Sequence, residues 1–262
     1  MSFITKSSAA LLVCYLLPAA AFSQAVADKD KRDILQRARD SYYSLPKEGL
    51  ANFSCAVVPN FGDVEAELRE ANPEAADNWA KQVAQIHIAV TVGPDGQAKV
   101  TRNDIADENL NVIADDTDQM VADFFALWSP YVVGTALPPT YADYELEDLG
   151  SEYRLSFKDG PANSVITLDK DLSVGARMIT GPNVNSVTWP QFTKTANGFL
   201  PASIDSDLRV PAKGQATHVA ASITYQEVSG LQLPKTIRED ITSGDNYDDI
   251  EVDLTGCAAS KR

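Results

Sequence analysis

The fold of this chain is decided by residues 217–257, which read THVAASITYQEVSGLQLPKTIREDITSGDNYDDIEVDLTGC. Apolar and polar residues alternate with a period of two in 219–226, and the alternation resumes after Ser229-Gly230 and again in 249–254. A period of two gives a strand one buried face and one wetted face. The stretch therefore predicts three consecutive strands of an antiparallel sheet that is covered on a single face.

The first 27 residues have the pattern of a secretory signal peptide. Lys6 precedes an apolar run from Ala9 to Phe22, and small residues follow up to Ala27. The run is shorter than the ~20 apolar residues that a membrane-spanning helix needs, and no later segment is apolar enough to span. We therefore expect cleavage near Ser23 to Ala27, no transmembrane segment, and a single domain of residues 28–262 in the periplasm or secreted.

The chain is strongly acidic, with 22 lysines and arginines against 37 aspartates and glutamates and a net charge of −15. The leader carries one basic residue and no acidic one, so its removal brings the charge to about −16. Such a surface repels phosphate backbones and anionic headgroups, which argues against nucleic acid as a partner. Strong net charge also keeps an exported domain soluble, so we expect a monomer.

Two of the three cysteines lie beyond the leader. Cys14 lies inside the apolar run, where the preceding Val13 argues against lipidation. Cys55 lies in the first strand-like segment and Cys257 directly follows the last one. In an oxidising compartment such a pair is expected to form a disulfide, and two buried free thiols are the alternative. Closing a loop of about 200 residues would stabilise the fold by ~5 kcal/mol.

Helical periodicity concentrates in the first half of the chain, and strand patterns follow it. The sequence predicts helices from Asp28 to Pro46, over 63–71, from Pro73 after an Asn72 cap, and from the acids at 115–117 to Ser129-Pro130, with a hairpin over 86–100. From Tyr144 onward we expect nine or ten strands. Helices early and strands late favour an α+β fold: a curved antiparallel sheet, or half-barrel, with helices covering the concave face.

Two turns have similar sequences: residues 197–201 (NGFLP) and 229–234 (SGLQLP) both place glycine, an apolar residue and proline at the start of a strand. Together with residues 166–169 (ITLD), the opening helix and the exported context, they resemble the half-barrel superfamily of periplasmic lipoprotein carriers, the LolA and LolB type. The resemblance covers the whole mature chain in the order of elements, and no individual functional residue of the family is matched. It implies a concave apolar sheet face, closed by helices, that holds an acyl chain away from water.

Catalytic and metal-binding motifs are absent from the sequence. The two histidines, His87 and His218, would have to meet each other and a carboxylate to bind a metal. The acidic runs 115–118 and 245–249 lack the spacing of a calcium loop, and there is no nucleophile elbow and no glycine-rich phosphate loop. We therefore expect a protein that is not an enzyme and has no metal or cofactor.

The most apolar helix carries the best candidate for a ligand site. Its wide apolar face either plugs the core of the sheet or closes a cavity, in which case two aromatic residues of a later strand would form the opposite wall. The predicted ligand-binding residues are Met120, Phe124, Phe125 and Trp128 on the helix and Trp189 and Phe192 on the strand.

Three functions follow in order of preference. The first is an exported, non-enzymatic protein that binds a lipid, a lipidated protein or another hydrophobic ligand between the sheet and a helical lid. The second is an interaction module with a fully packed core, whose partner is a protein of the envelope. An enzyme comes last.

Overall fold

The computed structural model describes residues 24–211, 214 and 216–262. Thirteen strands form one antiparallel sheet in the order β1-β5-β6-β7-β8-β9-β10-β11-β12-β13-β2-β3-β4. The strands are β1 (Gln24–Ala25), β2 (Leu50–Asn60), β3 (Ile88–Val92), β4 (Ala98–Arg102), β5 (Tyr144–Asp148), β6 (Glu152–Asp159), β7 (Ala162–Asp169), β8 (Val174–Thr180), β9 (Asn185–Thr195), β10 (Gly198–Arg209), β11 (Ala216–Val228), β12 (Leu231–Ser243) and β13 (Asn246–Lys261). The helices are α1 (Asp28–Asp40), α2 (Gly62–Ala71), α3 (Pro73–Val83) and α4 (Glu108–Val132).

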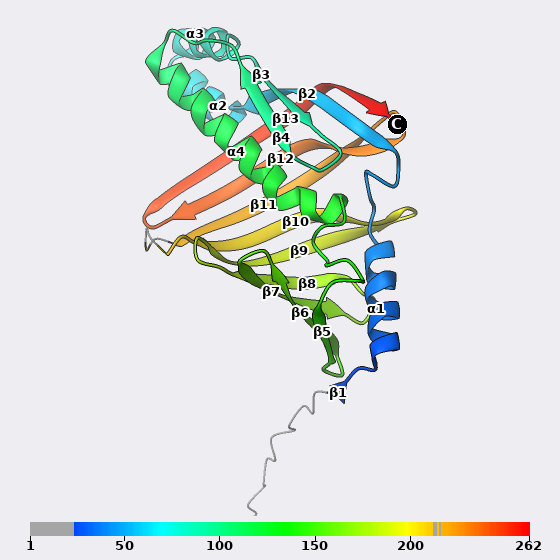
Figure 1. Ribbon diagram of the computed structural model, residues 1–262. Coiled ribbons are helices and arrows are strands. Elements are labelled where there is room, and N and C mark those ends of the chain that lie inside the picture. Colours follow the sequence, from blue (N-terminus) through cyan, green and yellow to red (C-terminus); the bar gives the residue numbers. More distant parts are fainter. Residues whose placement is uncertain (1–23, 212–213, 215) are drawn as a thin grey trace, which may run out of the picture.

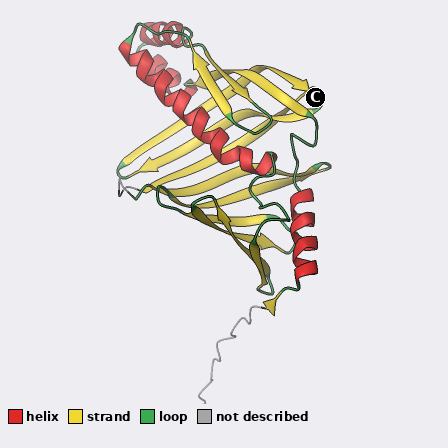
Figure 2. Cartoon of the chain, viewed as in Figure 1, coloured by secondary structure: helices red, strands yellow, loops and turns green. Residues whose placement is uncertain are grey.

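The sheet is open and curved, and α4 crosses one of its faces diagonally (Figure 1). Strands dominate the second half of the chain, while all four helices precede β5. Figure 2 distinguishes the helices from the strands of the sheet in the same view. The expected α+β fold with a curved antiparallel sheet is therefore confirmed. We call the face against which α4 packs the inner face, and the opposite one the outer face.

The predicted meander is present as β11, β12 and β13, which pair in sequence order. In its register, Val219 faces Ile241 across β11 and β12, and Ile237 faces Val252 across β12 and β13. The apolar phase of each strand lies on the inner face, as the alternation predicts, and the polar phase lies on the outer face. Local periodicity thus fixes which side chains of the meander meet α4.

The predicted disulfide between Cys55 and Cys257 is also confirmed. It joins β2 to β13, two strands that already pair along most of their length. The first long strand is thereby bonded to the last strand, and the alternative of two free thiols is excluded.

The opening helix is shorter than its periodicity predicts. α1 ends at Asp40 instead of Pro46, because the following backbone bonds to the start of β10. The amide of Phe199 donates to the Ser41 carbonyl at 2.8 Å, and the amide of Tyr43 donates to the Phe199 carbonyl at 3.0 Å. A long-range pairing therefore replaces what would have been the last turns of the helix.

The apolar helix begins earlier and ends later than predicted. α4 starts after Asp107, whose carboxylate accepts hydrogen bonds from the Asn109 and Leu110 amides, and it continues through Pro130 to Val132. The predicted start at 115–117 was wrong: Thr117 lies inside α4 and donates to a carbonyl one turn earlier. By contrast, the Asn72 cap of α3 is confirmed, because its side chain accepts from two backbone amides.

Of the four helices, α4 contributes most to the inner face and buries ten residues, whereas none of the described residues of α2 is buried. Figure 1 places α2 and α3 beside the end of the sheet where α4 begins, and α1 at one side of the sheet. The predicted leader lies, up to Ser23, outside the described residues. In the part of the chain that the structure describes, no helix is long and apolar enough to cross a membrane.

Candidate ligand groove beside helix α4

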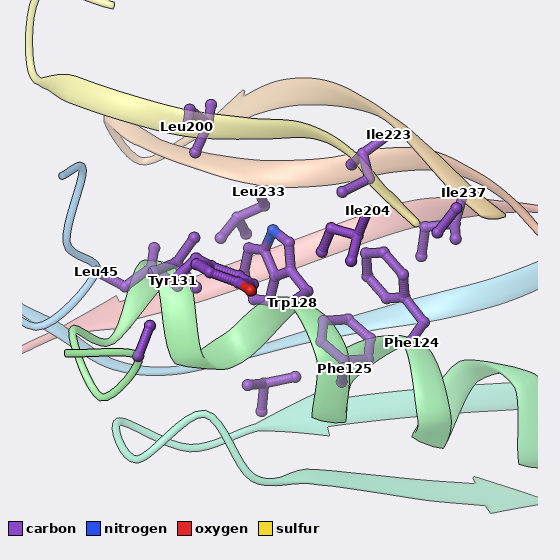
Figure 3. Close-up of a cluster of buried hydrophobic side chains, with 14 of the residues drawn as sticks. Leu45, Phe124, Phe125, Trp128, Tyr131, Leu200, Ile204, Ile223, Leu233 and Ile237 are labelled. Atoms are coloured by element: carbon purple, nitrogen blue, oxygen red, sulfur yellow. The ribbon is translucent and has the colours of Figure 1, made fainter. Parts of the chain in front are cut away.

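The aromatic side chains of α4 form the centre of the core. Phe124, Phe125 and Trp128 are fully buried and pack on one another, with ring centroids 5.1 to 6.2 Å apart (Figure 3). Trp128 Nε1 donates a hydrogen bond of 2.9 Å to the hydroxyl of Tyr225, which donates in turn to a β10 carbonyl. Together with the buried Met120, these residues fill the space between α4 and the sheet.

The two aromatic residues predicted for the opposite wall lie on different faces of the sheet. Phe192 lies on the inner face, half-buried against Tyr42, Tyr131 and Phe199 at centroid distances of 5.2 to 6.0 Å. Trp189 alternates with the buried Thr188 and Pro190 and lies 39% exposed on the outer face. The structure thus brings five of the six predicted residues to the inner face, and Trp189 is separated from them by the sheet.

A hollow of about 460 Å³ lies beside this core, between the flank of α4 and the inner face of β10 to β12. We call it the α4 groove. It is lined by Asp123, Ala126, Leu127, Val184, Leu208, Val210, Thr217, Val219, Glu239, Ile241 and Ser243. Most of these side chains are apolar, and none of the six predicted residues is among them. Its volume falls in the range of small-molecule sites, roughly 300 to 1,000 Å³.

Glu239 is the unusual residue of the groove. It lies on β12 between Ile237 and Ile241, in the apolar phase of the strand, and is only 1% exposed. Within the described part of the chain, its Oε1 atom has no hydrogen-bond partner. Burial, with a further contribution from the negative charge of Asp123, raises the pKa of Glu239 to about 8. The carboxyl is therefore mostly protonated at neutral pH.

Asp123 brings a second carboxyl to the groove from α4. It is exposed, and its Oδ2 atom accepts a hydrogen bond of 2.8 Å from the side chain of Gln119 one turn earlier. Neither lysine, arginine nor histidine appears among the described residues that line the groove. The described lining is thus mainly apolar, and its two ionisable groups are both acids.

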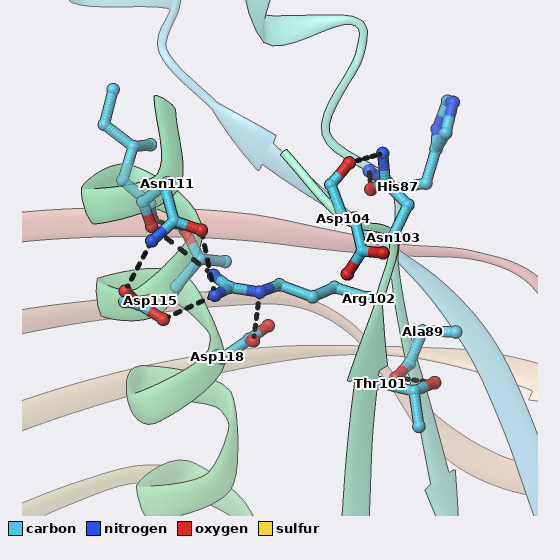
Figure 4. Close-up of polar contacts among 11 residues, drawn as sticks. His87, Ala89, Thr101, Arg102, Asn103, Asp104, Asn111, Asp115 and Asp118 are labelled. Atoms are coloured by element: carbon cyan, nitrogen blue, oxygen red, sulfur yellow. Dashed lines mark hydrogen bonds and ion pairs between the residues drawn. The ribbon is translucent and has the colours of Figure 1, made fainter. Parts of the chain in front are cut away.

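α4 is bonded to the sheet at two places, one on each side of the residues that line the groove. Near the start of the helix, the Arg102 guanidinium of β4 contacts Asp115 at 2.7 Å and Asp118 at 3.6 Å (Figure 4). It also donates to the backbone and side-chain oxygens of Asn111. At the other end, the hydrogen bond of Trp128 ties the helix to β11. The acidic run that the sequence suggested as a helix start therefore serves as an anchor for α4.

The histidines do not form a site. Both are exposed; His87 lies just before β3, and His218 on the outer face of β11 bonds to Asp207 at 2.8 Å. Within the described residues, no group of three or more histidine, cysteine or acidic side chains is placed to hold a metal ion. The groove offers burial and hydrogen bonding to a ligand.

The sequence already marks Glu239 as unusual for its position, although the periodicity does not indicate what the residue does. Residues 231, 233, 237 and 241 share the inner face, and position 239 falls in the same phase. A glutamate in the apolar phase of a strand is costly to bury, so it marks a place where a strand has something other than packing to do. Its proximity to α4 depends on long-range register.

A second hollow, of about 670 Å³, lies over the outer face at the same end of β8 to β12. Met178 and Val187 pair across β8 and β9 beside it, and Asp207 and His218 line it from β10 and β11. Trp189 lies on the same face one position further along the polar phase of β9. This side of the sheet therefore carries exposed apolar side chains among polar ones.

No protein-family model, no curated protein and no solved structure matches this chain, so the geometry of the groove is the basis for assigning a function.

Proposed function

We propose that this protein is an exported, non-enzymatic binding protein that holds a hydrophobic ligand between a curved sheet and α4. On this proposal the sheet is a half-barrel, with α4 as the main cover of its concave face. The ligand would be a lipid, the acyl chain of a lipidated protein or another hydrophobic molecule, as the resemblance to the periplasmic lipoprotein carriers implies. The observation that carries the proposal is the α4 groove, an apolar hollow of about 460 Å³ beside a filled core.

The physical basis of binding is burial. An alkyl chain that enters the groove removes its own surface and that of Leu127, Leu208 and Ile241 from water, at roughly 25 cal/mol per Å². The walls need little rearrangement, because α4 is anchored by Arg102 at one end and Trp128 at the other. A preformed site avoids the cost of ordering its walls when the ligand binds.

Mass spectrometry of an organic extract tests the proposal. The protein is purified from the periplasm without detergent, and its extract is compared with that of Ala126→Trp, which places a large ring at the rim of the groove. We expect a stoichiometric lipid in the wild-type extract and its loss in Ala126→Trp. The matched control is Val112→Trp, which adds the same ring at a 54% exposed position of α4 that does not line the groove.

An extract that contains no lipid, and a protein that stays empty after incubation with lipid vesicles, would contradict the proposal. Retention of the lipid by Ala126→Trp would place the ligand elsewhere on the molecule.

The exposed apolar residues of the outer face favour a second candidate, an interaction module of the envelope. Met178 and Trp189 stand on the side of the sheet that α4 does not cover. The filled core around Trp128 agrees with this alternative as well. If the extract contains no lipid and the Trp189→Asp variant binds an envelope protein more weakly than the wild type does, the interaction module is favoured over ligand carriage.

A further inference from the structure

The charges of the α4 groove narrow the class of ligand, provided that the groove binds a ligand as proposed above. Glu239 and Asp123 are the two ionisable side chains of its described lining, and the unpartnered Oε1 of Glu239 lies in a carboxyl that lines the hollow. A buried acceptor without a donor costs free energy, which a donating ligand would recover. Among the described residues, the groove therefore offers Glu239 Oε1 no donor, and its lining carries no positive charge.

Among the residues that the structure describes, each element packed around Glu239 contributes either an acid or no charge to its surroundings. α4 contributes Asp123, and β11 presents Val219 and Ala221 beside Glu239. β13 presents Ile250 opposite Glu239 and Asp248 opposite the next inner-face residue. The cation Arg177 shares the inner face, but it lies four strands away on β8, about 19 Å at the usual strand spacing. Arg177 is also paired with Asp159 at 3.0 Å.

We propose that the α4 groove selects a single-chain amphiphile whose head is a protonated amine. The alkyl chain lies along the apolar lining of α4 and β10 to β12, and the ammonium group lies between the carboxyls of Glu239 and Asp123. An ammonium group offers three donors, and its hydrogen bonds to carboxylates are charge-assisted and strong. A fatty-acid carboxylate in the same place would meet two acids and, among the described lining residues, no cation.

Binding of the amine displaces a proton. In the empty groove Glu239 is mostly protonated at neutral pH, and it becomes a carboxylate when the ammonium group arrives, so one proton is released to solvent. Below a pH of about 8, amine affinity should therefore fall by up to tenfold for each pH unit. Above it the affinity should level off until the amine itself deprotonates, near the usual pKa of about 10 for such a group.

Calorimetric titration of the purified, delipidated protein with three decyl probes tests this selection. Decylamine, decanol and decanoate share one chain and differ in the charge of the head, and each is used below its micelle concentration. At pH 8 we expect decylamine to bind at least tenfold more tightly than decanol and decanoate. Glu239→Gln and Asp123→Asn should each reduce the preference for decylamine over decanol about tenfold, and Glu239→Gln should abolish its pH dependence below pH 8.

Two controls separate the groove from the acidic surface. Ala126→Trp should abolish the binding of decylamine, and Glu145→Gln, at an exposed strand position outside the groove, should leave it unchanged. Decylamine binding that survives Ala126→Trp would mean general attraction to a chain of net charge −15 and would overturn the inference.

The outcomes distinguish the two proposals. If decanol or decanoate binds as tightly as decylamine, the groove is a ligand site without amine selection, and only the inference fails. The inference fails equally if both variants leave the preference unchanged. If none of the three probes binds, the proposed function fails with it.

Discussion

Glu239 makes the stability of this protein depend on pH in a way that one substitution should remove. Its pKa is about 8 in the folded protein and close to 4.5 in the unfolded chain. Because the folded pKa is raised, the stability that this group contributes is complete below pH 4.5. This stability is lost progressively as the pH rises toward 8, because the carboxyl ionises at a lower pH in the unfolded chain than in the folded protein.

The magnitude follows from the two pKa values. One unit of pKa difference corresponds to 1.36 kcal/mol. Ionisation of Glu239 therefore lowers the free energy of unfolding by about 4 kcal/mol at pH 7.5, relative to a strongly acidic solution. At pH 4.5 the same effect is only about 0.4 kcal/mol. Glutamine at position 239 has nearly the same shape and does not titrate. The difference in unfolding free energy between Glu239→Gln and wild type should therefore rise by about 3 to 4 kcal/mol from pH 4.5 to pH 7.5, in favour of the variant.

Urea unfolding of both proteins at pH 4.5, 6.0 and 7.5 measures this difference. Groups that titrate identically in both proteins cancel, and Glu145→Gln, at an exposed position of β5, should give a difference that does not change with pH. Glutamine brings its own unmet hydrogen bonds, which shift all three values by a similar amount of ~1 to 3 kcal/mol. A difference that stays flat across the three pH values would refute the burial of an unpartnered carboxyl at this position.

Three further predictions concern the frame of the fold. Serine in place of both bonded cysteines should lower the unfolding free energy by about 2 to 5 kcal/mol, measured by urea unfolding against the oxidised wild type. Trp128→Ala removes a fully buried ring and should lower the unfolding free energy by about 3 to 5 kcal/mol, measured in the same way. Trp128→Phe should lower it less, although this variant also loses the hydrogen bond to Tyr225 of β11. Gly198→Ala should lower the melting temperature strongly, because the backbone has a φ of 117° and the new Cβ would lie 2.6 Å from the backbone of residues 41–43. Gly160→Ala, with a φ of 59° and open space around it, is the matched control and should lose only the conformational part, of ~1 to 3 kcal/mol.

The parts of the fold that sequence predicts well are those in which local pattern and tertiary structure agree. The alternation of 219–226 sets one face of β11, and the same face meets α4. The pairing of Cys55 with Cys257 followed from compartment and parity, and the strands around the two cysteines are neighbours in the sheet. Neither of these two predictions required knowing which distant strands become neighbours, because each position has one favourable environment.

The errors occur where a distant segment competes for the same residues. α1 stops at Asp40 because the next residues bond to the start of β10, 157 residues further along the chain in the bridge of Tyr42 with Phe199. The acids at 115–118 resemble a helix start, yet they lie within α4 and bind Arg102 from β4. Propensity cannot anticipate either outcome, since both depend on which strands become neighbours.

The position of Glu239 also argues that the groove has a use beyond packing. A leucine at this place would extend the apolar surface formed by Ile237 and Ile241 and would not disfavour folding at neutral pH. Ionisation of the glutamate in the unfolded chain instead lowers the free energy of unfolding by about 4 kcal/mol at pH 7.5 relative to acid, a large part of the roughly 5 to 15 kcal/mol that stabilises most domains. The polar groups of Trp128 and Tyr225, by contrast, are satisfied by hydrogen bonds within the core. The carboxyl of Glu239, left without a partner at the wall of an apolar hollow, is the group to which the proposed amine ligand would supply the missing donor.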